Sequence, residues 1–375
     1  MVWEQRHQQS PSSWPTFALC SLALFLVLLD TTILFVAFHG IRTAFAASST
    51  AALSWILNAY TIVFGTLLVP AGRLADLYGR KRVFLIGVAL FTLASALCGF
   101  APSALALIGF RILQAIGAAL LMPASLALIL AAFPREKRSV AVSLWGAVGA
   151  LAAAVGPSLG AYVVATLGWP WAFFINVPVG LVGLALSARR LEESRSVELG
   201  ALPDVPGILL LSFGVGALAL GAVKSTDWGW ASLWTEGAFM IGLALLMVFV
   251  VWASRVDAPA LDLTLFRDRN YRFANVATLV FSVTFTAMFF GFFFFLTRVW
   301  GYTLPIAGLA VTPGPLMVIP VAIVGGRRAA RVGHRPLLVL GGIVYALGAA
   351  WIYMMAGPTP DFLRWLITKS ECIRC

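Results

Sequence analysis

The chain has 375 residues, of which 61% are apolar and only 11% are charged. A soluble domain has about 45–50% apolar and about 25% charged residues. This composition excludes a large water-soluble catalytic domain, a disordered chain and a disulfide scaffold. The net charge is +11 at pH 7, but the basic residues form short clusters between apolar runs, which is typical of cytoplasmic loops rather than of a nucleic-acid surface. The sequence therefore predicts an all-α polytopic membrane protein.

Long apolar runs bounded by charged residues or by Gly and Pro predict the membrane spans, since about 20 apolar residues cross a bilayer. The first run is longer than the roughly 7–15 apolar residues of a signal peptide, so we expect it to be retained as a helix. About eleven spans are predicted, with approximate limits 17–38, 51–71, 83–101, 104–130, 140–164, 171–188, 205–223, 232–252, 273–297, 303–325 and 336–356.

The segments between these spans alternate in basic content. With the N-terminus inside, the N-terminal segment and the inner loops together hold nineteen Lys and Arg residues, whereas the outer loops hold only Arg42, Lys224 and Arg298. Lys and Arg concentrate on the cytoplasmic side of membrane proteins. The pattern predicts a multi-pass protein of the bacterial cytoplasmic (plasma) membrane with its N-terminus in the cytoplasm.

Two charged residues lie deep inside predicted spans, where each costs at least about 2.5–3.5 kcal/mol on insertion scales. Asp30 is roughly 12 Å from the outer end of the first span, and Arg111 is roughly 10 Å from the outer end of the fourth, at 1.5 Å per residue. The Gly156-Pro157 pair of the fifth span lies at about the same level. We expect both charges and a helix bend to share one layer of the membrane.

Two interpretations of this layer are open. In the first, Asp30 is a protonatable carboxylate that pairs with Arg111 when it is ionised, because intramembrane ionisable groups mark ion pathways. In the second, the two residues form a static buried ion pair that fixes helix packing. Because it follows Arg111 by three residues, Gln114 is expected on the same helix face, together with Gly117.

No nucleotide-binding or metalloprotease signature is present, and no arrangement of a nucleophile beside a base is visible in the loops. We therefore expect neither an enzyme nor a cofactor or metal site. The expected partners are a small-molecule substrate, protons and the lipid bilayer, without nucleic acid or nucleotide.

The segment between the second and third spans reads Gly-Arg-Leu-Ala-Asp-Leu-Tyr-Gly-Arg-Lys-Arg over residues 72–82. It resembles motif A of the major facilitator superfamily, G-x-L-a-D-r-x-G-r-k-r, in the loop where that family has it. The resemblance implies a gating role for the residues at its motif positions, which are Gly72, Arg73, Asp76, Gly79, Arg80, Lys81 and Arg82.

Four further segments match the same family in chain order. Residues 29–32 (Leu-Asp-Thr-Thr) resemble the first-helix motif of the 14-span drug:proton antiporters, and residues 169–180 resemble the segment that leads into their sixth helix. Residues 111–117 are similar to motif B, with Arg111, Gln114 and Gly117. Residues 156–160 are similar to motif C, the antiporter signature, with Gly156, Pro157 and Gly160. The resemblance covers residues 15–360 and is to the EmrB/QacA-type branch, which implies proton coupling through Asp30 and Arg111.

The resemblance also implies how the chain is organised. We expect a six-helix bundle over 1–190, two extra central helices with their linkers over 191–272, three helices of a second bundle over 273–356, and an atypical polar tail over 357–375. Eleven of fourteen expected spans suggest a C-terminally truncated chain, which we expect to insert but not to export by itself.

The function implied by the resemblance is proton-coupled efflux of drugs or other small lipophilic or cationic compounds across the cytoplasmic membrane. Two alternatives stay open. One is export of a single metabolite or antibiotic. The other is a truncated, non-transporting remnant of such an exporter.

Overall fold

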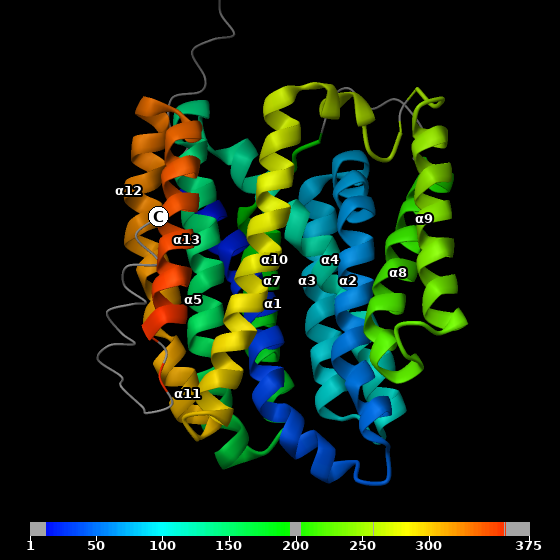
Figure 1. Ribbon diagram of the computed structural model, residues 1–375. Coiled ribbons are helices and arrows are strands. Elements are labelled where there is room, and N and C mark those ends of the chain that lie inside the picture. The colour runs from blue at the N-terminus through cyan, green and yellow to red at the C-terminus, as the bar shows by residue number, and fades with distance from the viewer. Residues whose placement is uncertain (1–12, 196–203, 258, 356, 358–375) are drawn as a thin grey trace, which may run out of the picture. The chain divides into compact units, whose positions relative to one another are not determined.

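A computed structural model describes residues 13–195, 204–257, 259–355 and 357, and every regular element in these residues is a helix (Figure 1). In chain order they are α1 (Ser13–Ala44), α2 (Thr50–Tyr78), α3 (Arg80–Gly99), α4 (Ala104–Ala132), α5 (Arg135–Leu167), α6 (Trp171–Phe174), α7 (Asn176–Arg190), α8 (Val205–Trp228), α9 (Leu233–Ala253), the short 3₁₀ helix η1 (Leu263–Arg267), α10 (Arg269–Arg298), α11 (Leu304–Val311), α12 (Pro313–Val332) and α13 (His334–Met355).

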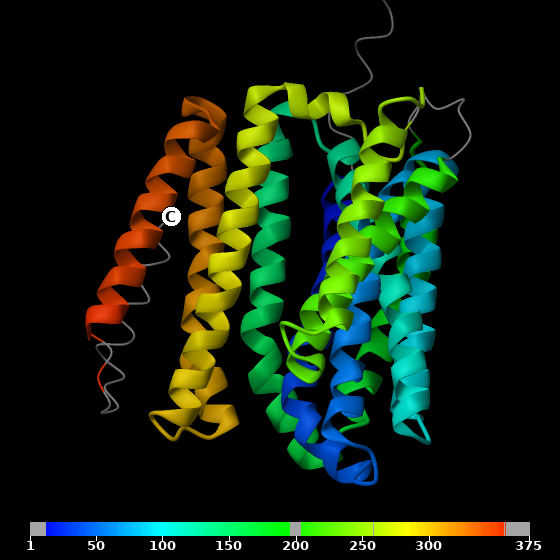
Figure 2. The same ribbon diagram turned by 45° about the vertical axis from the view of Figure 1, so that its right-hand side comes forward.

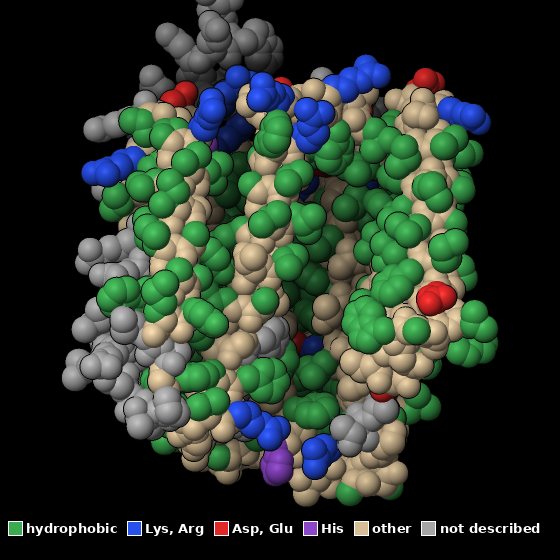
Figure 3. Space-filling view, in the orientation of Figure 1, with side chains coloured by type: hydrophobic (Ala, Val, Ile, Leu, Met, Phe, Trp, Pro, Cys, Tyr) green, Lys and Arg blue, Asp and Glu red, His purple; other side chains and the backbone are tan. Residues whose placement is uncertain are grey.

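The helices lie where the apolar runs predict spans. Within the described residues, ten segments are long and apolar enough to cross a membrane, and α10, with 30 residues, occupies the ninth predicted span. Two predicted spans are interrupted: the sixth consists of α6 and α7, and the tenth of α11 and α12, with α12 beginning at Pro313. On the face in Figure 3, hydrophobic side chains cover the flanks of the helices, and Lys and Arg gather near their ends. This is the surface of a polytopic membrane protein.

The chain divides into two compact units. Unit 1 consists of the described parts of Met1–Gly40, Leu128–Ala172 and Thr284–Cys375, and unit 2 of those of Ile41–Ala127 and Phe173–Val283. The predicted division at residues 190, 272 and 356 follows the chain order and stays a prediction. All of the predicted polar tail except Gly357 lies outside the described residues.

In unit 1, small residues bring α5 close to α1. A Cβ atom on Gly156 would collide with Oγ1 of Thr32, and one on Gly160 would lie 3.2 Å from the Cα atom of Ile33. Glycines at such positions let helix backbones approach closely in a membrane. The motif C glycines therefore pack directly against the helix that carries Asp30.

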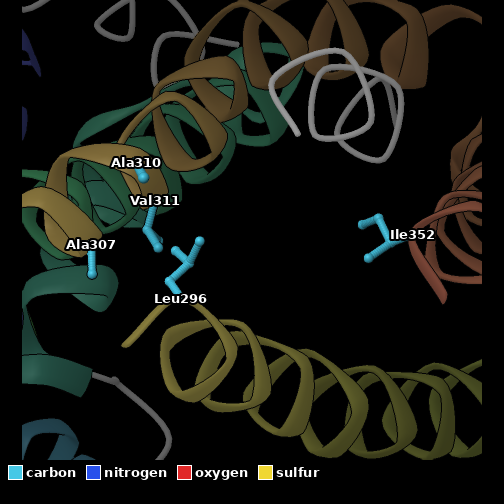
Figure 4. Packing of buried hydrophobic residues seen from close by; sticks show 5 residues of the cluster. All are labelled: Leu296, Ala307, Ala310, Val311 and Ile352. Atoms are coloured by element: carbon cyan, nitrogen blue, oxygen red, sulfur yellow. The ribbon is translucent and has the colours of Figure 1, made fainter. Parts of the chain in front are cut away.

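The other side of unit 1 is built from α11, α13 and the part of α10 from Thr284 onward, and α12 packs along α5 (Figures 1 and 2). In Figure 4, Leu296 of α10 and Val311 of α11 point toward each other, with Ala310 and Ala307 nearby. Ile352 of α13 belongs to the same apolar cluster. This apolar cluster joins α11 to α10 and α13.

In unit 2, α3 and α4 cross through a second pair of glycines. A Cβ atom on Gly117 would lie 2.6 Å from the backbone nitrogen of Phe91, and one on Gly87 would lie 2.8 Å from that of Leu121. Neither position has room for a larger side chain unless the backbones separate. This crossing fixes the register of α3 against α4, on which the position of the site depends.

The two predicted central helices, α8 and α9, form a closely packed hairpin in unit 2. The buried Asp204 carboxylate joins its ends: Oδ1 accepts hydrogen bonds from the backbone of Gly207 and from Nε1 of Trp252, and Oδ2 accepts one from the backbone of Ala260. The Ser212 hydroxyl donates to the carbonyl of Thr66 in α2. The hairpin is thus anchored to the helix that ends in motif A.

Candidate functional site

Arg111 of α4 lies in the interior of unit 2 with only 1% of its surface exposed. Its Nε donates to the carbonyl of Ile56 in α2 at 3.2 Å, and its Nη1 donates to Oε1 of Gln114 at 2.6 Å. Burying a guanidinium is costly unless its charge and donors are satisfied, and these contacts supply part of that compensation. The predicted position of Arg111 and Gln114 on one helix face is confirmed.

Two aromatic rings contact the same guanidinium. Its Cζ atom lies 4.0 Å from the ring centroid of Tyr60 and 5.8 Å from that of Phe173. Aromatic faces attract cations, most strongly where water is excluded. Both rings are nearly fully buried, with Tyr60 3% and Phe173 1% exposed. The site therefore stabilises a permanent positive charge inside the protein.

Gln114 connects Arg111 to α3. Its Nε2 donates to Oγ of Ser95 at 2.8 Å, and the Ser95 hydroxyl donates to the carbonyl of Phe91 at 2.7 Å. The thiol of Cys98 lies 3.9 Å from Gln114 Oε1. Sequence reasoning missed Ser95 and Cys98, because a lone Ser or Cys in an apolar run carries no signal of its own.

Asp30 lies in α1, in unit 1, with 2% of its surface exposed. The two threonines that follow it turn their hydroxyls back to their own helix: Thr31 donates to the carbonyl of Val27, and Thr32 to that of Leu28. The small exposed fraction of Asp30 confirms that this residue is buried, as the sequence predicts. Because Asp30 and Arg111 belong to different units, their predicted pairing stays a prediction.

Pro157 of motif C lies in the middle of α5, which continues unbroken from Arg135 to Leu167. A proline has no backbone N–H and therefore removes one helical hydrogen bond, here the one to the carbonyl of Ala153.

The next carbonyl in α5, that of Ala154, accepts a hydrogen bond at 3.0 Å from the hydroxyl of Thr312, at the junction of α11 and α12. A Cβ atom on Gly308 would lie 3.0 Å from Cβ of Pro157. Motif C therefore has α1 on one side and the α11–α12 junction on the other. The predicted bend at Pro157 stays a prediction.

The motif A residues lie at the turn between α2 and α3, in unit 2. Asp76 Oδ1 accepts two hydrogen bonds from Arg80, from Nε at 2.9 Å and from Nη2 at 2.8 Å. At Gly72, a Cβ atom would contact Pro123 of α4 at 3.5 Å. Nε of Arg73 is buried and has no hydrogen-bond partner among the described residues.

The motif A turn also has a partner that sequence reasoning missed. The carboxylate of Glu193, just beyond α7, accepts hydrogen bonds from the backbone nitrogens of Lys81 at 3.0 Å and Arg82 at 3.2 Å. Nε of Arg82 lies 3.9 Å from the same carboxylate. Gly79 has a φ of +109°, and a Cβ atom there would lie 2.7 Å from the Glu193 carboxylate. A carboxylate at a helix N-terminus is favoured by unpaired N–H groups and by the helix dipole.

We expect Glu193→Ala to loosen the first turn of α3, because the Lys81 and Arg82 amides would lose their acceptor. Loss of a helix cap costs about 1 kcal/mol, which corresponds to roughly fivefold faster hydrogen exchange of these two amides. Hydrogen exchange with mass spectrometry on the protein in nanodiscs measures it. Glu192→Ala is the matched control. Unchanged exchange at residues 80–83 in Glu193→Ala would contradict the capping role.

Comparison with known proteins identifies the chain. Residues 20–368 match the sequence profile of the Major Facilitator Superfamily. The chain belongs to the major facilitator superfamily. It is therefore a multi-pass membrane protein of a transporter family and not an enzyme.

Two relatives of this chain indicate the branch of the superfamily to which it is similar. The Multidrug resistance protein Stp of Mycobacterium tuberculosis is 36% identical over 343 residues, which are 89% of this chain and 62% of Stp. The Multidrug export protein EmrB of Haemophilus influenzae is 33% identical over 349 residues, which are 92% of this chain and 67% of EmrB. The resemblance to the EmrB-type branch is thus confirmed. The chain spans less than two thirds of the length of Stp.

The fold of the superfamily is also found in solved structures. A structure of the proton:xylose symporter XylE bound to 6-bromo-6-deoxy-D-glucose matches with a TM-score of 0.63 at 16% sequence identity. The match covers 98% of this chain and 79% of that one. At this identity the likeness establishes the fold alone, and the predicted all-helical major facilitator fold is confirmed.

Proposed function

We propose that the protein exports small lipophilic or cationic compounds across the cytoplasmic membrane in exchange for protons. The observation that carries this proposal is the burial of a permanent cation, Arg111, inside unit 2, where aromatic rings and backbone and amide oxygens hold it. Ionisable groups placed inside a membrane protein at such a cost are functional by default. The relationship to two proteins named for multidrug resistance or export supports the class of substrate.

In the proposed cycle, Asp30 carries the proton. When Asp30 is ionised, it is attracted to Arg111, and when it is protonated, that attraction is lost. A two-state protein shifts toward whichever state binds a ligand better, and here the ligand is the proton. Proton uptake from the outside would thereby favour one orientation and release to the cytoplasm the other. This direction assumes the predicted cytoplasmic N-terminus.

In the proposed cycle, the helix contacts of motif C transmit the movement. The α5 glycines pack against α1 at Thr32 and Ile33, immediately after Asp30. On its other side, α5 receives the hydrogen bond from Thr312 beside Pro157. A small shift of α1 caused by the charge of Asp30 would therefore be transmitted through α5 to the α11–α12 junction. Motif A, fastened by the Asp76–Arg80 and Glu193 contacts, is proposed to gate the cytoplasmic end.

The test is transport in liposomes with an imposed pH gradient by a purified parent protein of the full length of relatives such as Stp, of which this chain spans 62%. We expect uphill movement of a lipophilic cationic dye, abolished when a protonophore dissipates the gradient. A panel of unrelated lipophilic compounds in competition with the dye separates multidrug export from export of a single compound, because only the former is inhibited by several members. The absence of any gradient-driven movement would overturn the proposal in favour of a non-transporting protein.

A further inference from the structure

The hydrogen bonds that connect α3 to Arg111 form a series in which donors and acceptors can be assigned in only one way. An arginine side chain offers only donors, and a backbone carbonyl offers only acceptors. With Arg111 at one end and the Phe91 carbonyl at the other, Gln114 must turn its oxygen toward Arg111 and its amide toward Ser95. Ser95 must then accept from Gln114 and donate to Phe91. Chemistry therefore dictates each orientation.

The crossing of α3 and α4 sets the position of Ser95 in this series of hydrogen bonds. Gly87 meets Leu121 and Gly117 meets Phe91 across the α3–α4 contact. Continuing this antiparallel register by one turn places Ser95 opposite Gln114. Both side chains have 0% of their surface exposed, so water does not compete for these bonds in this structure. The Ser95 hydroxyl is a fixed acceptor at the point where the Gln114 amide needs one.

We propose that Ser95 is a positioning residue for the Arg111 guanidinium and that it acts through Gln114. The inference rests on the proposed coupling role of Arg111. Ser95 holds the Gln114 amide so that Oε1 meets Nη1 of Arg111 at 2.6 Å, while the Ile56 carbonyl and the Tyr60 ring hold the rest of the guanidinium. Without the Ser95 hydroxyl, the Gln114 amide loses the acceptor that orients it toward α3. The Arg111 side chain stays buried but loses the contact that fixes its direction.

This role predicts a specific defect in transport. Gradient-driven efflux by Ser95→Ala should fall by about tenfold or more, since a displacement of about 1 Å at a reacting group has effects of that order. Exchange of labelled for unlabelled dye at equal pH on both sides should stay within about twofold of wild type, because it needs no net proton movement. A merely structural role would lower both activities together.

Matched variants distinguish the effect of the Ser95 hydroxyl from the effect of side-chain volume. Ser95→Thr and Ser95→Val add the same bulk, and only Thr keeps the hydroxyl, so Thr should retain several times the gradient-driven rate of Val. Thr92→Val is the control: its hydroxyl, one turn earlier in α3, donates to the Val88 carbonyl and faces α7 at Gly180. In a Gln114→Leu background, Ser95→Ala should have no further effect. Equal rates for Ser95→Thr and Ser95→Val, or full additivity with Gln114→Leu, would overturn the proposal.

A second measurement does not depend on transport. In a protein whose other cysteines are replaced, the buried Cys98 thiol next to Gln114 Oε1 reports on the order of the network. Loosening the network by Ser95→Ala should speed labelling of Cys98 by N-ethylmaleimide about fivefold, as expected for easier local opening, whereas Thr92→Val should not. If wild type shows no gradient-driven efflux, the proposed function fails, and this labelling still decides whether Ser95 holds Gln114. Equal labelling rates in wild type and Ser95→Ala would contradict the inference.

Discussion

Replacement of Arg111 by alanine is expected to abolish gradient-driven efflux, and replacement by lysine to remove most of it. The guanidinium donates through Nε to Ile56 and through Nη1 to Gln114, and its Cζ atom lies over the Tyr60 ring. A lysine ammonium is a point charge on a flexible stem, and it cannot reproduce this fork or keep its charge as firmly when buried. We expect a loss of at least about a hundredfold in rate for alanine and about tenfold for lysine, similar to losses at other electrostatic sites.

The measurement is the initial rate of dye efflux in liposomes between about pH 6 and 8, which brackets physiological pH. Arg255→Lys, at an exposed position between α9 and η1, is the matched control and should transport like wild type. Membrane insertion should be equal for all three variants. Equal rates for wild type and Arg111→Lys across this range would show that the guanidinium geometry is dispensable.

The sequence was sufficient to predict the helices and the buried charges, for reasons that are local. An apolar run of about 20 residues can satisfy its backbone in a bilayer only as a helix, so α1 to α5 lie where predicted. Asp30 and Arg111 were conspicuous because a charge in such a run is expensive. Gln114 followed from helical spacing alone.

What the sequence left unpredicted depends on contacts between distant positions. Ser95 and Gln114 are joined only because glycines set the α3–α4 crossing, and a serine in an apolar run is equally compatible with a bond to its own helix. Glu193 caps α3 from more than a hundred residues away along the chain. In the sequence it is one of several charged residues in a polar loop, and nothing there indicates a capping role. The sequence predicted no break at Pro313, where α12 begins, whereas it predicted a bend at Pro157, which lies inside a continuous helix. Residue type alone therefore did not locate the breaks.

Asp30→Asn is expected to eliminate coupling while leaving the fold intact. Asparagine has nearly the same shape, and its amide cannot take up or release a proton in the accessible pH range. The α1 residues Thr32 and Ile33, which contact the α5 glycines, are unchanged in this variant, so we expect it to insert and remain stable. Gradient-driven efflux should fall by at least about a hundredfold, the scale on which loss of an essential proton carrier acts. Asp227→Asn, which alters an exposed ion pair with Lys224, is the matched control.

The central claim is that Asp30 carries the proton that is exchanged for substrate in the transport cycle in which Arg111 takes part. The most direct test measures proton movement itself, with a pH-sensitive dye inside liposomes, when substrate is added to wild type and to Asp30→Asn. We predict substrate-dependent proton movement in wild type, and in Asp30→Asn substrate exchange at equal pH without proton movement. Substrate-dependent proton movement of wild-type size in Asp30→Asn would contradict the account.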